Sequence, residues 1–557
     1  MAYSIGLDYG TNSVRCLIVD TGNGKELGTA VFNYPTGQMG IILDRADHNL
    51  ARQNPADYLK GLELTIKQAL AQAKKADRRF SADNVVGIGV DTTGSTPIPV
   101  DENGTPLAML KAFKGNPNAC VWLWKDHTGY AEAAEITALA RQEHPEYLAK
   151  CGGIYSSEWF FSKVLHCLRT DKKVYDAACT WVEHADWIPA VLTGTDHPSQ
   201  IKRCRCAAGH KALFNDQWGG YPARDFLVKL DPKLGKLSDS LPSKTCTIKD
   251  KAGDLTVQWA KRLGLPAGIP VAIGAFDAHL GGVGAGITRG SLVKIIGTST
   301  CDMSVWPNTD KVADVPGICG IVDGSILPGC WGLEAGQSAV GDIFNWFVND
   351  VQPGGKKAGS HEELTRKASK LKAGQSGLLA LDWNNGNRTI LVDQRLTGLL
   401  LGQTLHTQPE EIYRALVEAT AFGALTIINR FEEYGVQIKQ VINCGGIAEK
   451  SPMVMQIYAD VTGREMKVSR SAQTCALGTA IAAAVVGGAH KDFAAAQKAM
   501  CGLKKTTYKP NKANHEVYRQ LYALYKQLHD SFGVADHTES LYHVMKDLLV
   551  IKEKANA

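Results

Sequence analysis

The stretch IGLDYGTNSVRCLIVD, residues 5–20, decides how the chain begins. Two apolar segments flank a short polar turn, a pattern that predicts a β-hairpin. Gly10 lets the backbone of this turn approach an anion closely, and the residues that follow it can donate hydrogen bonds to phosphate oxygens. These donors are Thr11, Asn12 and Ser13. The hairpin is therefore predicted to bind phosphate, with Asp8 beside it to hold Mg²⁺ through water.

A second segment has the same form. VKIIGTSTCDMSVW, residues 293–306, again places Gly-Thr and further hydroxyls between two apolar strands. Hairpin turns favour glycine for structural reasons alone, so one such hairpin is weak evidence. Two hairpins that align Gly10 with Gly297 indicate that the chain consists of two related halves. Thr298 and Ser299 are then expected to bind one polyphosphate from the side opposite the first hairpin.

Two further strands end in an acid. NVVGIGVDTTGST (residues 84–96) leads into Asp91, and IPVAIGAFDAHLGGVGAG (residues 269–286) leads into Asp277. Strands alternate with helical segments such as residues 55–76, which predicts α/β architecture. An Asp after a strand often serves only as a helix N-cap, and that structural role is the alternative for Asp277.

Composition excludes several classes. The 557 residues are 44% hydrophobic and 21% charged, with 61 basic against 56 acidic residues, so no nucleic-acid partner is expected. The first residues do not resemble a secretory signal, and the apolar run 475–489 is shorter than the roughly 20 residues that span a bilayer, which predicts a cytoplasmic protein with a buried helix there. Fourteen scattered cysteines predict reduced thiols, and Cys204, Cys206 and His210 lack a fourth zinc ligand.

Common nucleotide motifs are absent. The segment GGIAEKS, residues 445–451, lacks the glycine that a P-loop places before its lysine, and no G-x-G-x-x-G follows the first strand. The longer stretch QVINCGGIAEKSPMVMQIYADVTG, residues 440–463, predicts a strand, a glycine turn and a helix that begins after Ser451. Adenine could lie against the bare backbone of Gly445 and Gly446, although close helix packing explains small residues equally well.

Several long motifs resemble one family. They are VDTTGSTPIPVD (90–101), NPNACVWLWKDHT (116–128), GGIYSSEWFFSKVLH (152–166), RCRCAAGHKALF (203–214), GAFDAHLGGVGAG (274–286), IGTSTCD (296–302) and GLEAGQSAVGDIF (332–344). Over essentially the whole chain, the sequence resembles the FGGY carbohydrate kinases, and among them the bacterial ribulokinases. The resemblance implies an actin/Hsp70-like (ribonuclease H-like) ATPase fold with an interdomain cleft for MgATP. The expected domains are residues 1–286, with the sugar site and catalytic base, and residues 287–557, with the nucleotide site.

The resemblance also implies residue roles. Asp277 matches the general base, and together with Asp8 it is expected at the metal. The nucleotide segments carry Thr11, Asn12, Ser13 and Arg15 in the first hairpin, Gly297, Thr298 and Ser299 in the second, and Gly445 and Gly446 at the adenosine. The sugar is expected against Ile98, Trp124, Lys125, Asp126, Lys211 and Glu334.

The expected reaction is ATP-dependent phosphorylation of L-ribulose to L-ribulose 5-phosphate in L-arabinose catabolism. The alternatives are a kinase for another ketopentose or pentitol, such as xylulose or ribitol, and an actin/Hsp70-like ATPase that binds a protein partner. In-line transfer between ligands in different halves requires the cleft to close, with a hinge expected near Gly286. The sequence does not decide whether copies of the chain form a homo-oligomer.

Overall fold

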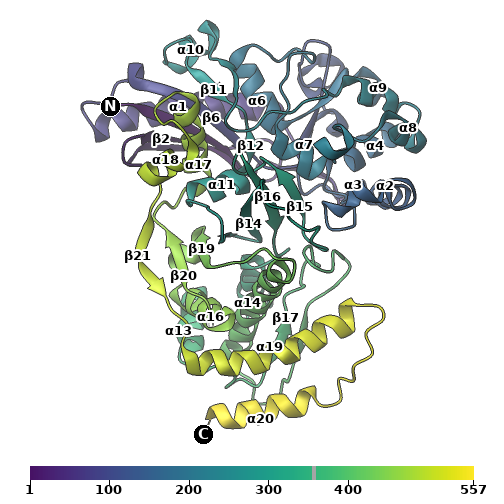
Figure 1. The fold of residues 1–557 in the computed structure, drawn as a ribbon, viewed down its shortest axis with the longest axis vertical. Helices are drawn as coiled ribbons and strands as arrows, with labels where there is room; N and C mark the ends of the chain where they lie inside the picture. Colours follow the sequence, from purple (N-terminus) through teal and green to yellow (C-terminus); the bar gives the residue numbers. More distant parts are fainter. Residues whose placement is uncertain (354–358, 557) are drawn as a thin grey trace.

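The computed structural model describes residues 1–353 and 359–556. It contains two α/β units, one above the other in Figure 1, and each unit is built on a mixed sheet of seven strands. The chain begins in the upper unit, whereas its C-terminal helices α19 (Lys512–Gly533) and α20 (Val544–Asn556) lie at the bottom of the lower one. The two-domain α/β architecture predicted from the sequence is confirmed.

The first large sheet has the order β10-β11-β6-β1-β2-β3, and β12 pairs with β6. Strands β1 to β3 are antiparallel, whereas β6 runs parallel to β1, β11 and β12. The strands are β1 (Tyr3–Tyr9), β2 (Ser13–Asp20), β3 (Glu26–Asn33), β6 (Val85–Thr92), β10 (Lys251–Asp254), β11 (Pro270–Ala272) and β12 (Ala275–Phe276). Two small sheets accompany it: β4 (Ile42–Leu43), β5 (Ala51–Gln53) and β8 (Val121–Trp122), and β7 (Pro97–Val100) with β9 (Thr180–Glu183).

Eleven α-helices of the described residues belong to the first half of the sequence. They are α1 (Pro55–Ala76), α2 (Tyr130–Glu143), α3 (Pro145–Ala149), α4 (Phe160–Thr170), α5 (Lys172–Ala177), α6 (His184–Thr193), α7 (Arg205–Lys211), α8 (Arg224–Leu230), α9 (Leu234–Ser240), α10 (Val257–Leu263) and α11 (Asp277–Gly284). Helix α1 begins as its sequence predicts, because the Asn54 side chain accepts from the Ala56 amide and Pro55 fills the first helical position. Its apolar face, with Leu62 and Ile66, is buried against the first sheet.

The second large sheet has the order β15-β16-β14-β13-β19-β20-β21. Its strands are β13 (Ser291–Ile296), β14 (Thr300–Pro307), β15 (Gly320–Asp323), β16 (Cys330–Ala335), β19 (Gln440–Cys444), β20 (Met466–Ser469) and β21 (Leu503–Tyr508); β17 (Leu379–Leu381) and β18 (Leu399–Leu401) form a separate pair. The remaining α-helices of the described residues are α12 (Gly341–Asn345), α13 (His361–Ala368), α14 (Pro409–Glu433), α15 (Gly446–Lys450), α16 (Pro452–Thr462), α17 (Thr474–Val486) and α18 (Phe493–Met500), besides α19 and α20.

The two predicted hairpins are confirmed as β1–β2 and β13–β14. In each, the glycine amide closes the turn: Gly10 donates to the Ser13 carbonyl and Gly297 to the Ser299 carbonyl, both at 2.9 Å. Each hairpin also has a parallel partner on its other edge, β6 beside β1 and β19 beside β13. The repeat detected in the sequence is therefore a repeat of three-dimensional structure.

Two helices cross between the sheets. Helix α11, which follows the first sheet in sequence, contacts β13 and β14, whereas α17 packs on β1 and β6 of the first sheet and lies in the upper unit in Figure 1. The predicted buried helix near residue 475 is thus confirmed as α17. It approaches the sheet so closely that a Cβ at Gly6 or Gly89 would overlap the backbone carbonyl of Ala476 or Thr479. Glycine is required at both strand positions because the helix backbone itself fills the space.

None of the described helices is both long enough and apolar enough to cross a bilayer. All fourteen cysteines lie in the described ranges, and each carries a free thiol, as the sequence predicts.

Candidate functional site

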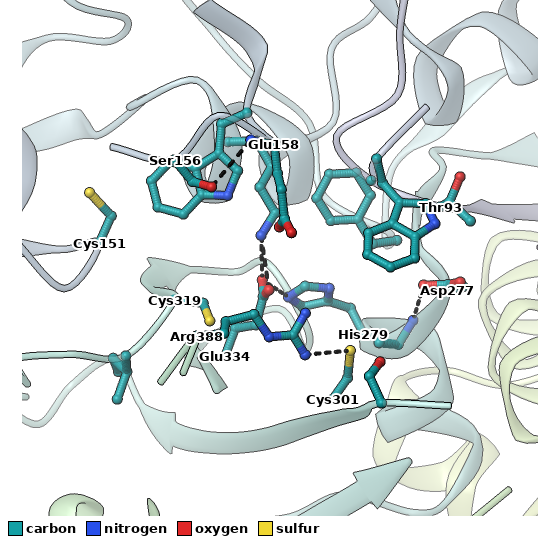
Figure 2. Close-up of a pocket in the computed structure, with 18 of the residues that line it drawn as sticks. Thr93, Cys151, Ser156, Glu158, Asp277, His279, Cys301, Cys319, Glu334 and Arg388 are labelled. Atoms are coloured by element: carbon teal, nitrogen blue, oxygen red, sulfur yellow. Dashed lines mark hydrogen bonds and ion pairs between the residues drawn. The ribbon is translucent and has the colours of Figure 1, made fainter. Parts of the chain in front are cut away.

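A cavity of about 230 Å³ lies between the two halves. The first half lines it with Trp159, Lys211 and Asp277, and the second half contributes Thr298 and Glu334 among others. Figure 2 shows Asp277, His279, Glu334 and Arg388 in this pocket, with Ser156 and Glu158 drawn on its other side. We call it the acid cavity.

A larger cavity of about 780 Å³ adjoins it. Most of its lining residues carry hydroxyl or amide groups, among them Asn12, Ser157 and Ser338, and Lys125 and Asp342 add charge. We call it the hydroxyl cavity. The two cavities share lining residues from both halves, namely Thr11, Trp124, Glu158, Thr298, Ser299, Arg388 and Gln394. Both predicted phosphate hairpins therefore contribute to one continuous space.

Asp277 stands where β12 becomes α11. Phe276 holds the N-cap position, and Asp277 is the first residue of the helix, so the N-cap alternative from the sequence is not the role it has here. Its Oδ1 accepts from the Ala278 amide at 2.7 Å, which fixes the carboxylate at the cavity wall. Burial, followed by the charge of Asp8, raises the pKa of Asp277 to about 7.

Asp277 belongs to a group of three carboxylates brought together by the first sheet. Asp8 and Asp91 are paired in register on β1 and β6, and β12 adds Asp277 beside them. The Thr479 hydroxyl donates to Asp91 Oδ2, whereas Asp91 Oδ1 is buried without a partner. Burial raises the pKa of Asp91 well above its usual range, and the charges of Asp8 and Asp277 raise it further. Carboxylate oxygens are the ligands that a hard divalent cation such as Mg²⁺ prefers, and of these three residues Asp277 is the one at the wall of the acid cavity, whereas Asp8 and Asp91 line neither cavity.

The tip of the first hairpin is held from two sides. Trp124 Nε1 donates to Thr11 Oγ1 at 3.0 Å, and Gln53 Nε2 donates to the Thr11 carbonyl at 2.7 Å. Asn12 Nδ2 donates to the Met39 carbonyl. Arg15 pairs with Asp8 at 3.5 Å, which places it beside the carboxylates, whereas Ser13 begins β2 and lines neither cavity.

The second hairpin tip is held by the start of α12. The Val340 and Asp342 amides donate to the Thr298 carbonyl at 2.8 and 3.1 Å, and the Gly341 amide donates to Gly297. Gly445 packs against the carbonyl of Ile296, so the Gly445–Gly446 turn lies beside this hairpin although it lines neither cavity.

A buried ion pair joins the halves inside the acid cavity. Lys211 Nζ donates to the two carboxylate oxygens of Glu334 at 2.9 and 3.1 Å. Burial alone would raise the pKa of Glu334, but Lys211 and then His210 and His279 lower it, so the carboxylate is ionised. His210, His279 and Glu334 are spaced closely enough to hold a metal, but Lys211 already occupies both oxygens.

The predicted sugar residues divide. Lys211, Glu334 and Trp124 line the acid cavity, and Lys125 lines the hydroxyl cavity. Asp126 lines neither cavity, because its buried carboxylate pairs with Arg52 and accepts from Ala51 and Thr128. Ile98 is fully buried in β7 and also lines neither.

Comparison with known families covers most of the chain. Residues 3–284 match the N-terminal domain of the FGGY family of carbohydrate kinases, and residues 292–486 match its C-terminal domain. The chain belongs to the FGGY family of carbohydrate kinases. It is 43% identical to a ribulokinase of Vibrio parahaemolyticus over 94% of this chain and 95% of that one, and 43% identical to a ribulokinase of Bacillus licheniformis over 97% of each.

Solved structures of other kinases share the fold. A ligand-bound xylulose kinase from Lactobacillus acidophilus matches with a TM-score of 0.80 over 96% of this chain and 99% of that one, at 17% identity. A Plasmodium falciparum glycerol kinase with ADP matches with a TM-score of 0.75 over 95% and 98% of the two chains, at 14% identity. At such identities the similarity establishes the actin-like two-domain fold of this FGGY kinase.

The candidate site contains residues that sequence reasoning did not assign to it. Asp91 was visible as an acid at a strand end, but only the register with Asp8 shows that the two are neighbours. Glu158 and Arg388 line both cavities; Glu158 lies within the motif of residues 152–166 but was not singled out there, and Arg388 lies in none of the quoted motifs. His279 follows Asp277 on α11 and contacts Glu334 at 3.5 Å, a position that helix spacing from Asp277 does not by itself reveal.

Proposed function

We propose that this FGGY kinase transfers the γ-phosphoryl group of ATP to the terminal hydroxyl of L-ribulose, forming L-ribulose 5-phosphate in L-arabinose catabolism. The observation that carries the proposal is the acid cavity, which is lined both by Asp277, a carboxylate of raised pKa, and by the buried Lys211–Glu334 pair. The ribulokinases that are 43% identical over nearly the full length supply the choice of sugar.

Asp277 serves as the general base. It accepts the proton of the sugar hydroxyl while that oxygen forms a bond to the γ-phosphorus, and the bond between this phosphorus and the β,γ-bridging oxygen breaks to release ADP. A base with a pKa near 7 is well matched to operation at neutral pH, because it is available in its ionised form and still binds the proton.

The hairpin tips orient the nucleotide. Thr11 and Asn12 on one side and Thr298 and Ser299 on the other would donate hydrogen bonds to phosphate oxygens, and charge-assisted bonds of this kind are about twice as strong as neutral ones. The Gly445–Gly446 turn would carry the adenosine beside the second hairpin. Asp8, Asp91 and Asp277 would hold Mg²⁺, which neutralises phosphate charge when it is bound.

Lys211 and Glu334 would bind adjacent hydroxyls of an open-chain ketopentose. An ammonium and a carboxylate in a desolvated cavity form strong hydrogen bonds to hydroxyl groups, and a sugar that lacks one of those hydroxyls leaves a buried charge unpaired. This arrangement also supports the runner-up, a kinase for another ketopentose or a pentitol.

An ADP-release assay over L-ribulose, xylulose, ribitol, other pentuloses and glycerol tests the proposal. We expect L-ribulose to give the highest kcat/KM and to stimulate ATP consumption well above the hydrolytic background. A higher kcat/KM for another acceptor would replace the substrate assignment. A rate of ATP hydrolysis that is the same with and without every sugar, and that increases with a protein partner, would favour the alternative of a partner-binding ATPase.

A further inference from the structure

The wall between the two cavities carries a single cation. Of the seven described residues that line both cavities, Arg388 is the one with positive charge and Glu158 the one with negative charge. On one side of this wall stand Asp277 and Lys211, and on the other stand Asn12 and Ser338. A group that passes from a nucleotide in the hydroxyl cavity to an acceptor in the acid cavity has to pass this wall.

The guanidinium of Arg388 is held through one of its nitrogen atoms. Its Nη2 donates to the Thr300 carbonyl, directly after the second hairpin tip, and lies 3.8 Å from Cys301 Sγ. Gly336 makes this seat, because a Cβ there would lie 2.6 Å from Arg388 Nη2. Arg388 Nε is buried without a hydrogen-bond partner.

Arg388 also differs from the other buried arginines in its lack of a counter-ion. Within the described ranges, no carboxylate oxygen lies within 4 Å of its guanidinium, whereas Arg414 pairs with Glu418 at 2.7 Å and Arg52 pairs with Asp126. A half-buried guanidinium without a carboxylate is costly unless an anionic ligand completes it. The polarity of the site therefore calls for an anion at this position.

The loop that carries Arg388 presents it rigidly. Asn387 and Asp393 exchange two backbone hydrogen bonds of 2.9 Å, and the Ile390 amide donates to the Gly317 carbonyl at 2.7 Å. Between them Ile390 and Val392 adopt φ values of 88° and 52°, which β-branched residues rarely accept. Strain of this kind, held by surrounding bonds, is typical of functional loops. In Figure 2 the Arg388, His279 and Asp277 side chains follow one another along one side of the pocket, across from Glu158.

We propose that Arg388 is a further catalytic residue, which contacts the γ-phosphoryl group during transfer and stabilises the negative charge on its equatorial oxygens. The inference rests on the proposed kinase function. Arg388 neither gains nor loses a proton, and its planar fork can bind two phosphoryl oxygens at once. Glu158 would repel the same group, so the phosphoryl is placed on the Arg388 side of the wall. Arginines in this role contribute about 10³- to 10⁵-fold to kcat in other phosphoryl-transfer enzymes.

The test compares Arg388→Met with Arg395→Met. Arg395 lies on the same segment, pairs with Asp393 and is 92% exposed, which makes it the matched control. For Arg388→Met we expect kcat with the best acceptor of the panel to fall about 10³-fold. The affinity for the Mg²⁺ complex of the β,γ-imido analogue of ATP should fall about tenfold or more, as expected when a charged hydrogen bond is lost. The affinities for MgADP and for the sugar should change less than twofold, and Arg395→Met should match the wild type throughout.

Three results would overturn the assignment: a kcat within threefold of the wild type, equal losses for the imido analogue and for ADP, or loss of sugar affinity alone. If Arg388→Met lowers Tm, Arg388→Lys replaces it in the test, because lysine keeps the positive charge but lacks the planar guanidinium. The kcat of Arg388→Lys should lie between those of Arg388→Met and the wild type, while its affinity for MgADP is unchanged. A wild-type enzyme that phosphorylates no sugar would refute the proposed function instead, and the ratio of imido-analogue to ADP affinity would still decide whether Arg388 contacts the γ-phosphoryl.

Discussion

The two hairpins β1–β2 and β13–β14 share one backbone plan but place their charges differently. Asp8 and Arg15 pair across the first hairpin at 3.5 Å, with side chains that are 13% and 35% exposed. In the second hairpin the charged pair lies one position further from the turn: Lys294 and Asp302 pair at 2.6 and 2.8 Å and are almost completely buried. A charge near the cavities remains available to a ligand, whereas a charge with a fully satisfied partner in the core is committed to the fold.

The first half therefore supplies the carboxylates beside the cavities, whereas both halves supply hydroxyl groups from their hairpin tips. Asp8, Asp91 and Asp277 all lie on or beside the first sheet, and the position equivalent to Asp8 in the second hairpin is Ile295. The predictions that follow test this division, beginning with the largest expected effect.

Replacement of the base should give the largest loss. Asp277→Asn keeps the shape and the hydrogen bond from Ala278 but removes the basic oxygen, so kcat should fall about 10²- to 10⁴-fold, the usual contribution of general-base catalysis. Because Asp8 and Asp91 would still hold Mg²⁺, nucleotide affinity should change far less than kcat, and Tm should stay near the wild-type value. Steady-state kinetics with calorimetric nucleotide binding checks both, and a folded variant with normal turnover would contradict the assignment.

Breaking the buried pair of the second hairpin should affect stability instead. Lys294→Met leaves Asp302 as an uncompensated buried charge, which costs about 3–5 kcal/mol of unfolding free energy. The matched change in the first hairpin, Arg15→Met, should cost less than about 1 kcal/mol because that pair is partly solvated. Urea unfolding compares the two variants; equal losses would mean that the hairpins do not differ as described.

The pH dependence should follow Asp277. Its pKa is raised to about 7, chiefly by burial, and the base acts only when ionised. At limiting substrate, kcat/KM should therefore be constant above pH 7 and decline about tenfold per pH unit well below it. The residual activity of Asp277→Asn should lack this limb. A wild-type profile that is flat from pH 5.5 to pH 8.5 would contradict the role of Asp277.

The hydroxyls of the two tips should give the smallest and most similar effects. Thr11→Val and Thr298→Val each remove a donor from the wall shared by the cavities, and each should raise the KM for MgATP about tenfold with little change in the KM for the sugar. Ser13→Ala, on a residue that lines neither cavity, is the control. An effect confined to the sugar would place the nucleotide elsewhere.

Local pattern predicted those features whose cause is local. Gly10 and Gly297 mark the hairpins because a tight turn needs them, and Asn54 and Pro55 mark the start of α1 for the same kind of reason. Asp277 was singled out because an acid at a strand end has a recognisable sequence setting, and the structure places it at the wall of the acid cavity; its role as the base stays a prediction. The family resemblance then supplied roles for residues such as Lys211 and Glu334, which no short pattern joins across 123 positions.

Features with a long-range cause were not predictable in this way. Asp126 and Ile98 lie in motifs that suggested the sugar site, but the partners that bury them, Arg52 on β5 and the neighbouring strand β9, come from distant segments. Arg388 reaches the cavities from an irregular loop with no periodicity to interpret. The contact of α17 with β1 and β6 depends on glycine at position 6 of β1 and at position 89 of β6, and the reason for these glycines is visible only once the helix backbone is in place.

The seat of α17 has a consequence for biosynthesis. Strand β1 leaves the ribosome hundreds of residues before α17, the helix that covers it. Until then, the glycines on the face that α17 covers provide no side chains to shield the backbone of the sheet. Domains usually fold in the order in which they are synthesised. Here the first sheet cannot be covered until Thr474–Val486 has been synthesised. A nascent chain arrested before that helix therefore exposes the glycine-bearing face of the sheet to chaperones.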